Sequence, residues 1–176
     1  MKTIFLTYAR YNKDADQAVV NLLNGLSQED REKDRGSYYK SASNLARHLL
    51  NGTLFFEGLF KPALAGNPKA LEALASSEGI KVPEKALTEA QWKTLVPAFN
   101  TVDNSLIELV SALTDEDFKT PVKVPFYGGK PDAVPLYFLL QNLEVHNAHH
   151  RGQISQILDE LKIDHNFSAI KIEFLG

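Results

Sequence analysis

Apolar residues recur at steps of three or four along four separate stretches of the chain. This spacing places the apolar side chains on one face of an amphipathic helix. It predicts helices near residues 3–26, 37–60, 89–113 and 135–161. Between the second and third helices, proline and glycine interrupt the pattern, which indicates a long connection. We therefore predict an all-α fold, a four-helix bundle with one long crossover between helices 2 and 3.

Glycine, serine and proline mark the expected ends of these helices. Gly36 and Ser37 are expected to open the second helix, and Pro135 suits the first position of the fourth. Pro97 lies inside the third apolar pattern. Because proline has no backbone N–H to donate, it predicts either a kink in that helix or a later start.

The connections are expected to carry shorter elements. These are a capped turn at 27–30, a short helix near 69–75, a strand or hairpin over 122–129, and an extended C-terminal segment over 170–174 that lies on the bundle. No internal repeat or long linker divides the sequence. We therefore expect residues 1–176 to form a single domain.

Composition narrows the class of protein. The 176 residues are 44% hydrophobic and carry a formal net charge of −3. Such a chain has enough apolar material for a core but lacks the basic face that nucleic-acid binding requires. No run approaches the roughly 18 apolar residues of a membrane span, and the N-terminus lacks the pattern of a signal peptide. We therefore expect a protein that binds neither nucleic acid nor membranes.

The chain contains no cysteine. That absence excludes disulfides, thiolate metal sites and a cysteine nucleophile, and it is in keeping with a cytoplasmic location. Any metal would be held by His, Asp or Glu.

Histidine takes the place of Leu or Ile at the centre of the fourth predicted helix. His146 and His150 are four residues apart, so both side chains lie on the apolar face of that helix. His48 borders the inward face of the second predicted helix, near its middle. Because mid-helix positions meet at one level of an antiparallel bundle, these three imidazoles are candidates for one metal site. Gly52, one turn from His48, is expected to leave space beside the metal for a further ligand.

Three neutral imidazoles with an open fourth position are typical of catalytic metal sites. Imidazole suits Zn²⁺, Ni²⁺ and Fe²⁺, of which we favour Zn²⁺ and Ni²⁺. Gln153 and Asn142 are candidate partners for the imidazole N–H groups, and His149 is either another such partner or a surface residue pointing away from the metal. The alternative is that His146 and His150 are hydrogen-bonded core residues without a metal.

Two segments of the chain resemble one known family. The segment 146–154, which reads HNAHHRGQI, resembles the HxxxH-R-G-Q signature on the last helix of the DinB/YfiT-like proteins. The segment 36–48, which begins GSYYKS and ends LARH, is similar to the family's second-helix motif. The resemblance implies a four-helix bundle and commonly a homodimer. It also implies a divalent metal held by the family's three histidines, which fall on His48, His146 and His150.

The resemblance leaves several functions open. The family includes enzymes that transfer a low-molecular-weight thiol to an electrophile, which favours a metal-dependent thiol S-transferase acting on a small-molecule substrate. A metal-dependent hydrolase and a non-enzymatic bundle that binds a metal or small molecule are the alternatives. The sequence assigns no general base, although Tyr8, Tyr11 and Asn147 lie near the candidate site in helical register.

Overall fold

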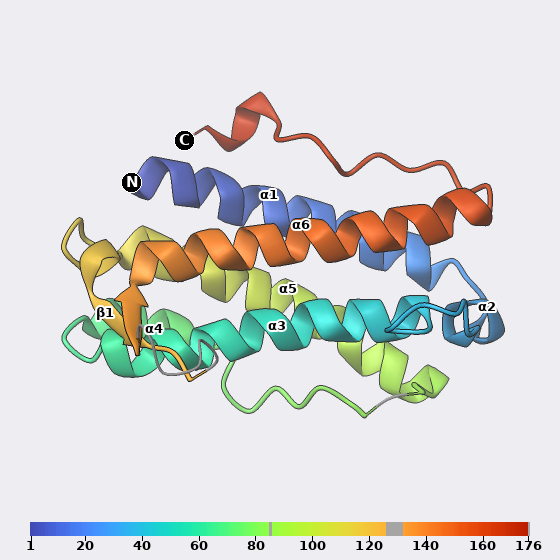
Figure 1. Ribbon diagram of the computed structural model, residues 1–176, viewed down its shortest axis with the longest axis horizontal. Helices are drawn as coiled ribbons and strands as arrows, with labels where there is room; N and C mark the ends of the chain where they lie inside the picture. The colour runs from blue at the N-terminus through green and yellow to red at the C-terminus, as the bar shows by residue number, and fades with distance from the viewer. Residues whose placement is uncertain (85, 126–131, 176) are drawn as a thin grey trace.

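Four long helices make up most of the protein. The computed structural model describes residues 1–84, 86–125 and 132–175. The long helices are α1 (Lys2–Asn24), α3 (Ala42–Ala63), α5 (Glu89–Ala112) and α6 (Leu136–Glu160). They lie side by side (Figure 1), with α1 and α3 each packed against both α5 and α6. The prediction of an all-α fold is confirmed.

Helix α3 begins at Ala42, and the expected start at Gly36 and Ser37 is wrong. Lys40 has a φ of 67°, a left-handed conformation that a helix cannot continue through. Ser41 then caps the helix by accepting a hydrogen bond from the Asn44 N–H. The residues just before the cap therefore form a turn.

Neither Pro97 nor Pro135 stands at the first position of its helix. Helix α5 begins at Glu89 after a capping box and continues through Pro97, so a later start is wrong. Pro97 is exposed, and water can therefore satisfy the carbonyl that loses its intrahelical partner. Pro135 precedes α6 as its N-cap, and Leu136 is the first helical residue.

Short elements occupy the connections. They are α2 (Gln28–Glu32), α4 (Pro68–Ala75), the 3₁₀ turns η1 (Asp117–Lys119) and η2 (Ile172–Phe174), and the strands β1 (Pro121–Lys123) and β2 (Ala133–Pro135). The strands pair antiparallel, with Val122 opposite Val134. In Figure 1 this ribbon and α4 lie at one end of the bundle and α2 at the other. Phe126, Gly128 and Gly129, which belong to the predicted hairpin, lie outside the described residues.

The C-terminal segment runs back along α1 (Figure 1). Arg10 donates a hydrogen bond to the Phe174 carbonyl at 2.9 Å, and Lys171 pairs with Asp14 at 2.7 Å. The segment ends in η2, and Ile170 and Ile172 are exposed. The expectation of a wholly extended tail is therefore wrong, because polar contacts hold the segment while Ile170 and Ile172 stay in solvent.

A layer of buried polar residues separates two apolar clusters in the bundle. One cluster contains Phe60 and Leu139, and the other contains Trp92 and Leu158. The polar residues come from the middle of all four long helices and comprise Asn12, Asp16, Thr53, Asp103, Ser105, Asn147, His150 and Arg151. We call this set the polar layer. It lies at the level where the histidines of α3 and α6 meet.

Within the described ranges, no helix has the length and apolar character needed to cross a membrane.

Candidate metal centre

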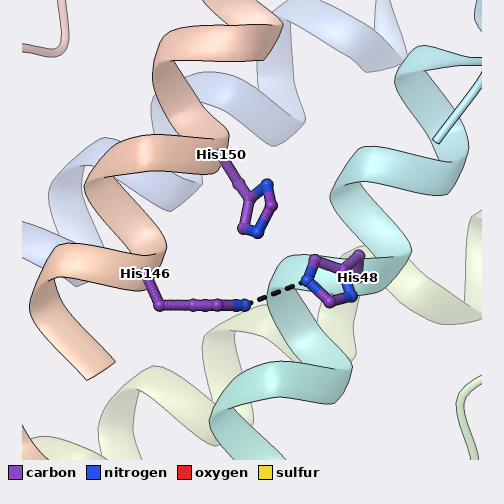
Figure 2. A group of neighbouring side chains, drawn as sticks. All are labelled: His48, His146 and His150. Carbon is purple, nitrogen blue, oxygen red and sulfur yellow. Dashed lines mark hydrogen bonds between the residues drawn. The ribbon is translucent and has the colours of Figure 1, made fainter. Parts of the chain in front are cut away.

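Three imidazoles converge between α3 and α6. Figure 2 shows His48 projecting from α3 toward His146 and His150 on α6. One nitrogen of each ring lies within 4.8 Å of the corresponding nitrogens of the other two, and the Nε2 atoms of His48 and His146 are 3.0 Å apart. Tetrahedral Zn²⁺ with imidazole ligands needs separations of roughly 3.3 Å. The group is therefore of a size to hold one metal ion.

Gly52 makes the close approach of α6 to α3 possible. A Cβ atom at this position would lie 2.5 Å from Cε1 of His146. The space that the missing side chain leaves is therefore filled by the His146 ring. The expectation that Gly52 clears room beside the metal for a further ligand is wrong, since its role is to admit the imidazole itself.

Amide side chains set the orientation of the two α6 rings. The Asn147 amide group donates to Thr53 Oγ1, which leaves Asn147 Oδ1 to accept from His146 Nδ1 at 3.0 Å. Gln153 Oε1 accepts from His150 Nδ1 at 2.7 Å. An amide oxygen can only accept, so both Nδ1 atoms carry the proton. The lone pairs then reside on the Nε2 atoms, which are free to bind a metal.

The electrostatics of the group favour neutral rings. Burial and repulsion from His150 and His146 lower the pKa of His48 to about 4. Burial also lowers the pKa of His150, and the hydrogen bond that His150 donates to Gln153 opposes this shift. Neutral imidazole is the form that binds metal. In charge and in chemical type, these residues fit a divalent transition-metal ion.

The remaining predicted site residues are distributed around this group. Asn142 is half-buried on α6, one turn before His146, while His149 is exposed and does not belong to the converging group. Tyr8 lines an apolar cavity between α1 and α6. Tyr11 donates to the Phe167 carbonyl. Of the three residues near the site in register, only Asn147 contacts a histidine of the group.

Tyr39 is a neighbour of the group that the helical pattern did not identify. Its hydroxyl oxygen lies 2.9 Å from His48 Nε2, and its ring packs 4.4 Å from the His48 ring and 5.1 Å from the His150 ring. Burial raises the pKa of Tyr39, so the hydroxyl keeps its proton at neutral pH. The sequence signal was the family-like segment 36–48, in which Tyr39 directly precedes the left-handed Lys40.

Arg151 connects the helix of the two histidines to α1. It donates from Nη1 to Asp16 at 2.8 Å and from Nη2 to Asn12 at 2.7 Å, and it lies over the Tyr11 ring. Burial raises the pKa of the Asp16 carboxyl, and the attraction of Arg151 opposes that shift. Because Arg151 directly follows His150, these contacts help to fix the rotation of α6 about its axis.

A cavity of about 650 Å³ opens beside His48 and Tyr39. Its wall carries basic and acidic side chains and is lined by Glu32, Asp34, Tyr38, Lys40, Asn44, Arg47 and Ala86 in addition to those two residues. The cavity offers a small polar molecule a route to the imidazoles from the side of α3.

Comparison with known proteins agrees with this geometry. The model of the DinB family matches residues 1–161 of the 176-residue chain. No curated protein and no solved structure matches the chain. The matched range contains all four long helices and the three converging histidines, and the chain therefore belongs to the DinB family.

Proposed function

We propose that His48, His146 and His150 hold one divalent metal ion, with Zn²⁺ and Ni²⁺ favoured over Fe²⁺. We further propose that this centre transfers a low-molecular-weight thiol to an electrophile. The observation that carries the proposal is the convergence of three imidazole nitrogens, two of them turned inward by amide partners. The adjoining cavity supplies space for a substrate.

The residues present indicate what the protein and the substrate would each contribute to the reaction. A divalent ion lowers the pKa of a thiol bound to it and so favours the nucleophilic thiolate. The chain has no cysteine, so the thiol must come from the substrate. The three histidines hold the ion, while Asn147 and Gln153 fix two of their rings.

The cavity wall favours a substrate that bears both charges. Lys40 and Arg47 face the cavity together with Glu32 and Asp34. Arg47 donates a hydrogen bond to the Pro83 carbonyl and pairs with the exposed Glu84 at 3.9 Å. A pair so exposed and so distant contributes little, which leaves the guanidinium able to bind a carboxylate. We propose a small thiol with amino-acid character.

Single alanine variants test the metal assignment. We expect His146→Ala and His150→Ala to lose stoichiometric metal and His48→Ala to bind it much more weakly, since each removes one ligand. His149→Ala is the matched control and is expected to keep the metal, because its exposed ring lies outside the group. Elemental analysis and calorimetric titration with Zn²⁺ and Ni²⁺ measure the outcome. Loss of metal from His149→Ala alone, or affinity weaker than millimolar in the unmodified chain, would contradict the assignment.

A conjugation screen tests the reaction. The metal-loaded protein is expected to join small thiols to an electrophile, and a chelator is expected to stop the reaction. Ester or amide cleavage in place of conjugation would establish the hydrolase alternative. Bound metal without activity against either panel would favour a non-enzymatic binding protein.

We also propose that the chain forms a homodimer. Ile4, Tyr137 and Val145 are exposed apolar residues around a cavity of about 450 Å³ between α1 and α6. Exposed apolar side chains gathered in this way are typical of an interaction surface, and a second copy is the partner that family membership favours. We expect sedimentation at micromolar concentration to give a dimer that Val145→Glu dissociates. A monomer at that concentration would disprove the proposal.

A further inference from the structure

The Tyr39 hydroxyl lies at the open side of the three imidazoles. It is 2.9 Å from His48 Nε2, the same atom that lies 3.0 Å from His146 Nε2. Its ring is tilted against the His48 ring and meets the His150 ring edge-on. Tyr39 also lines the cavity beside the site. The hydroxyl therefore lies between the ligand atoms and the space from which a substrate would arrive.

The backbone on both sides of Tyr39 is held in place. The Arg35 N–H donates to the Lys40 carbonyl at 2.8 Å, which closes the turn that contains Tyr39. After Lys40, which has a φ of 67°, Ser41 caps helix α3. A turn closed on one side and joined to a capped helix on the other keeps the Tyr39 ring against the imidazoles.

In the metal-bound centre, this hydroxyl cannot donate a hydrogen bond to His48 Nε2. An imidazole nitrogen has one lone pair, and Nε2 of His48 cannot give it to a metal and also accept a hydrogen bond. The hydroxyl proton then needs another acceptor at the same place. Three histidines leave a coordination position open, and the atom that fills it comes from outside the protein.

We propose that Tyr39 is a catalytic residue of this centre, whose hydroxyl donates a hydrogen bond to the non-protein atom in the open coordination position. The inference rests on the proposed metal centre and is independent of which reaction the centre performs. A hydrogen bond to a charged acceptor is among the stronger ones and orients the atom that accepts it. Tyr39 would thereby bind and aim the reacting atom of the substrate.

Azide binding to the Co²⁺-loaded protein tests this role. Azide is an anion that takes an open coordination position and accepts hydrogen bonds, and the visible spectrum of Co²⁺ reports its binding. We expect Tyr39→Phe to weaken azide binding about tenfold, the loss of one charge-assisted hydrogen bond. Its affinity for Co²⁺ itself is expected to change less than about threefold, because the three histidine ligands remain.

Tyr137→Phe is the matched control. Tyr137 is 37% exposed on α6 and does not line the cavity beside the three imidazoles, so its variant is expected to bind both Co²⁺ and azide like the unmodified chain. Circular dichroism verifies that both variants keep their helices. Unchanged azide affinity in Tyr39→Phe would overturn the inference. So would a large loss of Co²⁺ affinity with tighter azide binding, which would make Tyr39 a fourth ligand. Failure of the unmodified chain to bind Co²⁺ would overturn the metal centre as well, which distinguishes the two failures.

Discussion

Gly52→Ala is expected to abolish metal binding while leaving the helical fold intact. The added Cβ would lie 2.5 Å from Cε1 of His146, a distance too short for two non-bonded carbon atoms. Because the contact is with the far end of a side chain, the His146 ring can rotate away without moving the helices. Its Nε2 then leaves the group. We expect metal affinity to fall about 100-fold or more.

Gly52→Ala is informative because it should lower the metal affinity without lowering the stability of the fold. Gly52 lies inside α3, where alanine in place of glycine stabilises a helix by about 1 kcal/mol. Thermal unfolding of the metal-free variant should therefore show no loss. Gly58→Ala is the matched control on the same helix, since a Cβ there meets nothing within 4 Å. Full metal affinity in Gly52→Ala, with Gly58→Ala unchanged, would show that the ring does not need this space.

Arg151→Met is expected to be the most destabilising single change in the polar layer. Arg151 is 2% exposed, and it is the hydrogen-bond partner of the buried Asp16 carboxylate. Removing one partner of a buried ion pair leaves an uncompensated charge and costs about 3–5 kcal/mol. Denaturant unfolding of the metal-free protein at pH 8 measures this loss without interference from the centre.

The loss should depend on pH. The pKa of Asp16 is already raised by burial, and losing Arg151 removes the attraction that opposes this shift. A raised carboxyl pKa stabilises the folded state at low pH, and that stabilisation disappears as pH rises through the folded pKa. Arg151→Met should therefore lose less stability at pH 5 than at pH 8. The double variant with Asp16→Asn should regain a large part of the loss at pH 8. A loss of equal size at both pH values would contradict a charge-based explanation.

The sequence predicted those features that depend on the repeat within one helix. His146 and His150 share a face because they are four residues apart, and the apolar spacing around them shows that this face points inward. His48 could be matched to them because all three positions lie near the middle of long helices. Local periodicity is therefore enough to identify these three residues as one candidate site.

Features that depend on packing between helices were not predictable in the same way. The role of Gly52 follows from how closely α6 approaches α3, which no pattern within α3 reveals. The sequence pattern does not identify Tyr39, because the helical spacing continues back through residue 38, whereas the left-handed Lys40 separates Tyr39 from the helix. Its position depends on the turn and not on a helical face.

The spacing of apolar residues does not predict the polar layer either. Asp16 and Asp103 are carboxyl residues in amphipathic helices, where such residues normally face water. In this protein both are buried, and Arg151 is buried with them. The hydrogen bond from Arg151 to Asp16 joins α6 to α1 across 135 positions of the sequence, so only the folded arrangement identifies the partners.

The convergence of α3 and α6 has a consequence for folding. His48 and His146 are 98 positions apart, so an ion held by both would close a loop comprising more than half of the chain. Cross-links that close long loops restrict the unfolded chain most, and a ligand that binds only the folded form stabilises it in proportion to the logarithm of its concentration. In this cysteine-free chain, the metal centre would thus act as a reversible cross-link between α3 and α6. The fraction of folded protein would then rise with the metal concentration, whereas a disulfide gives no such dependence.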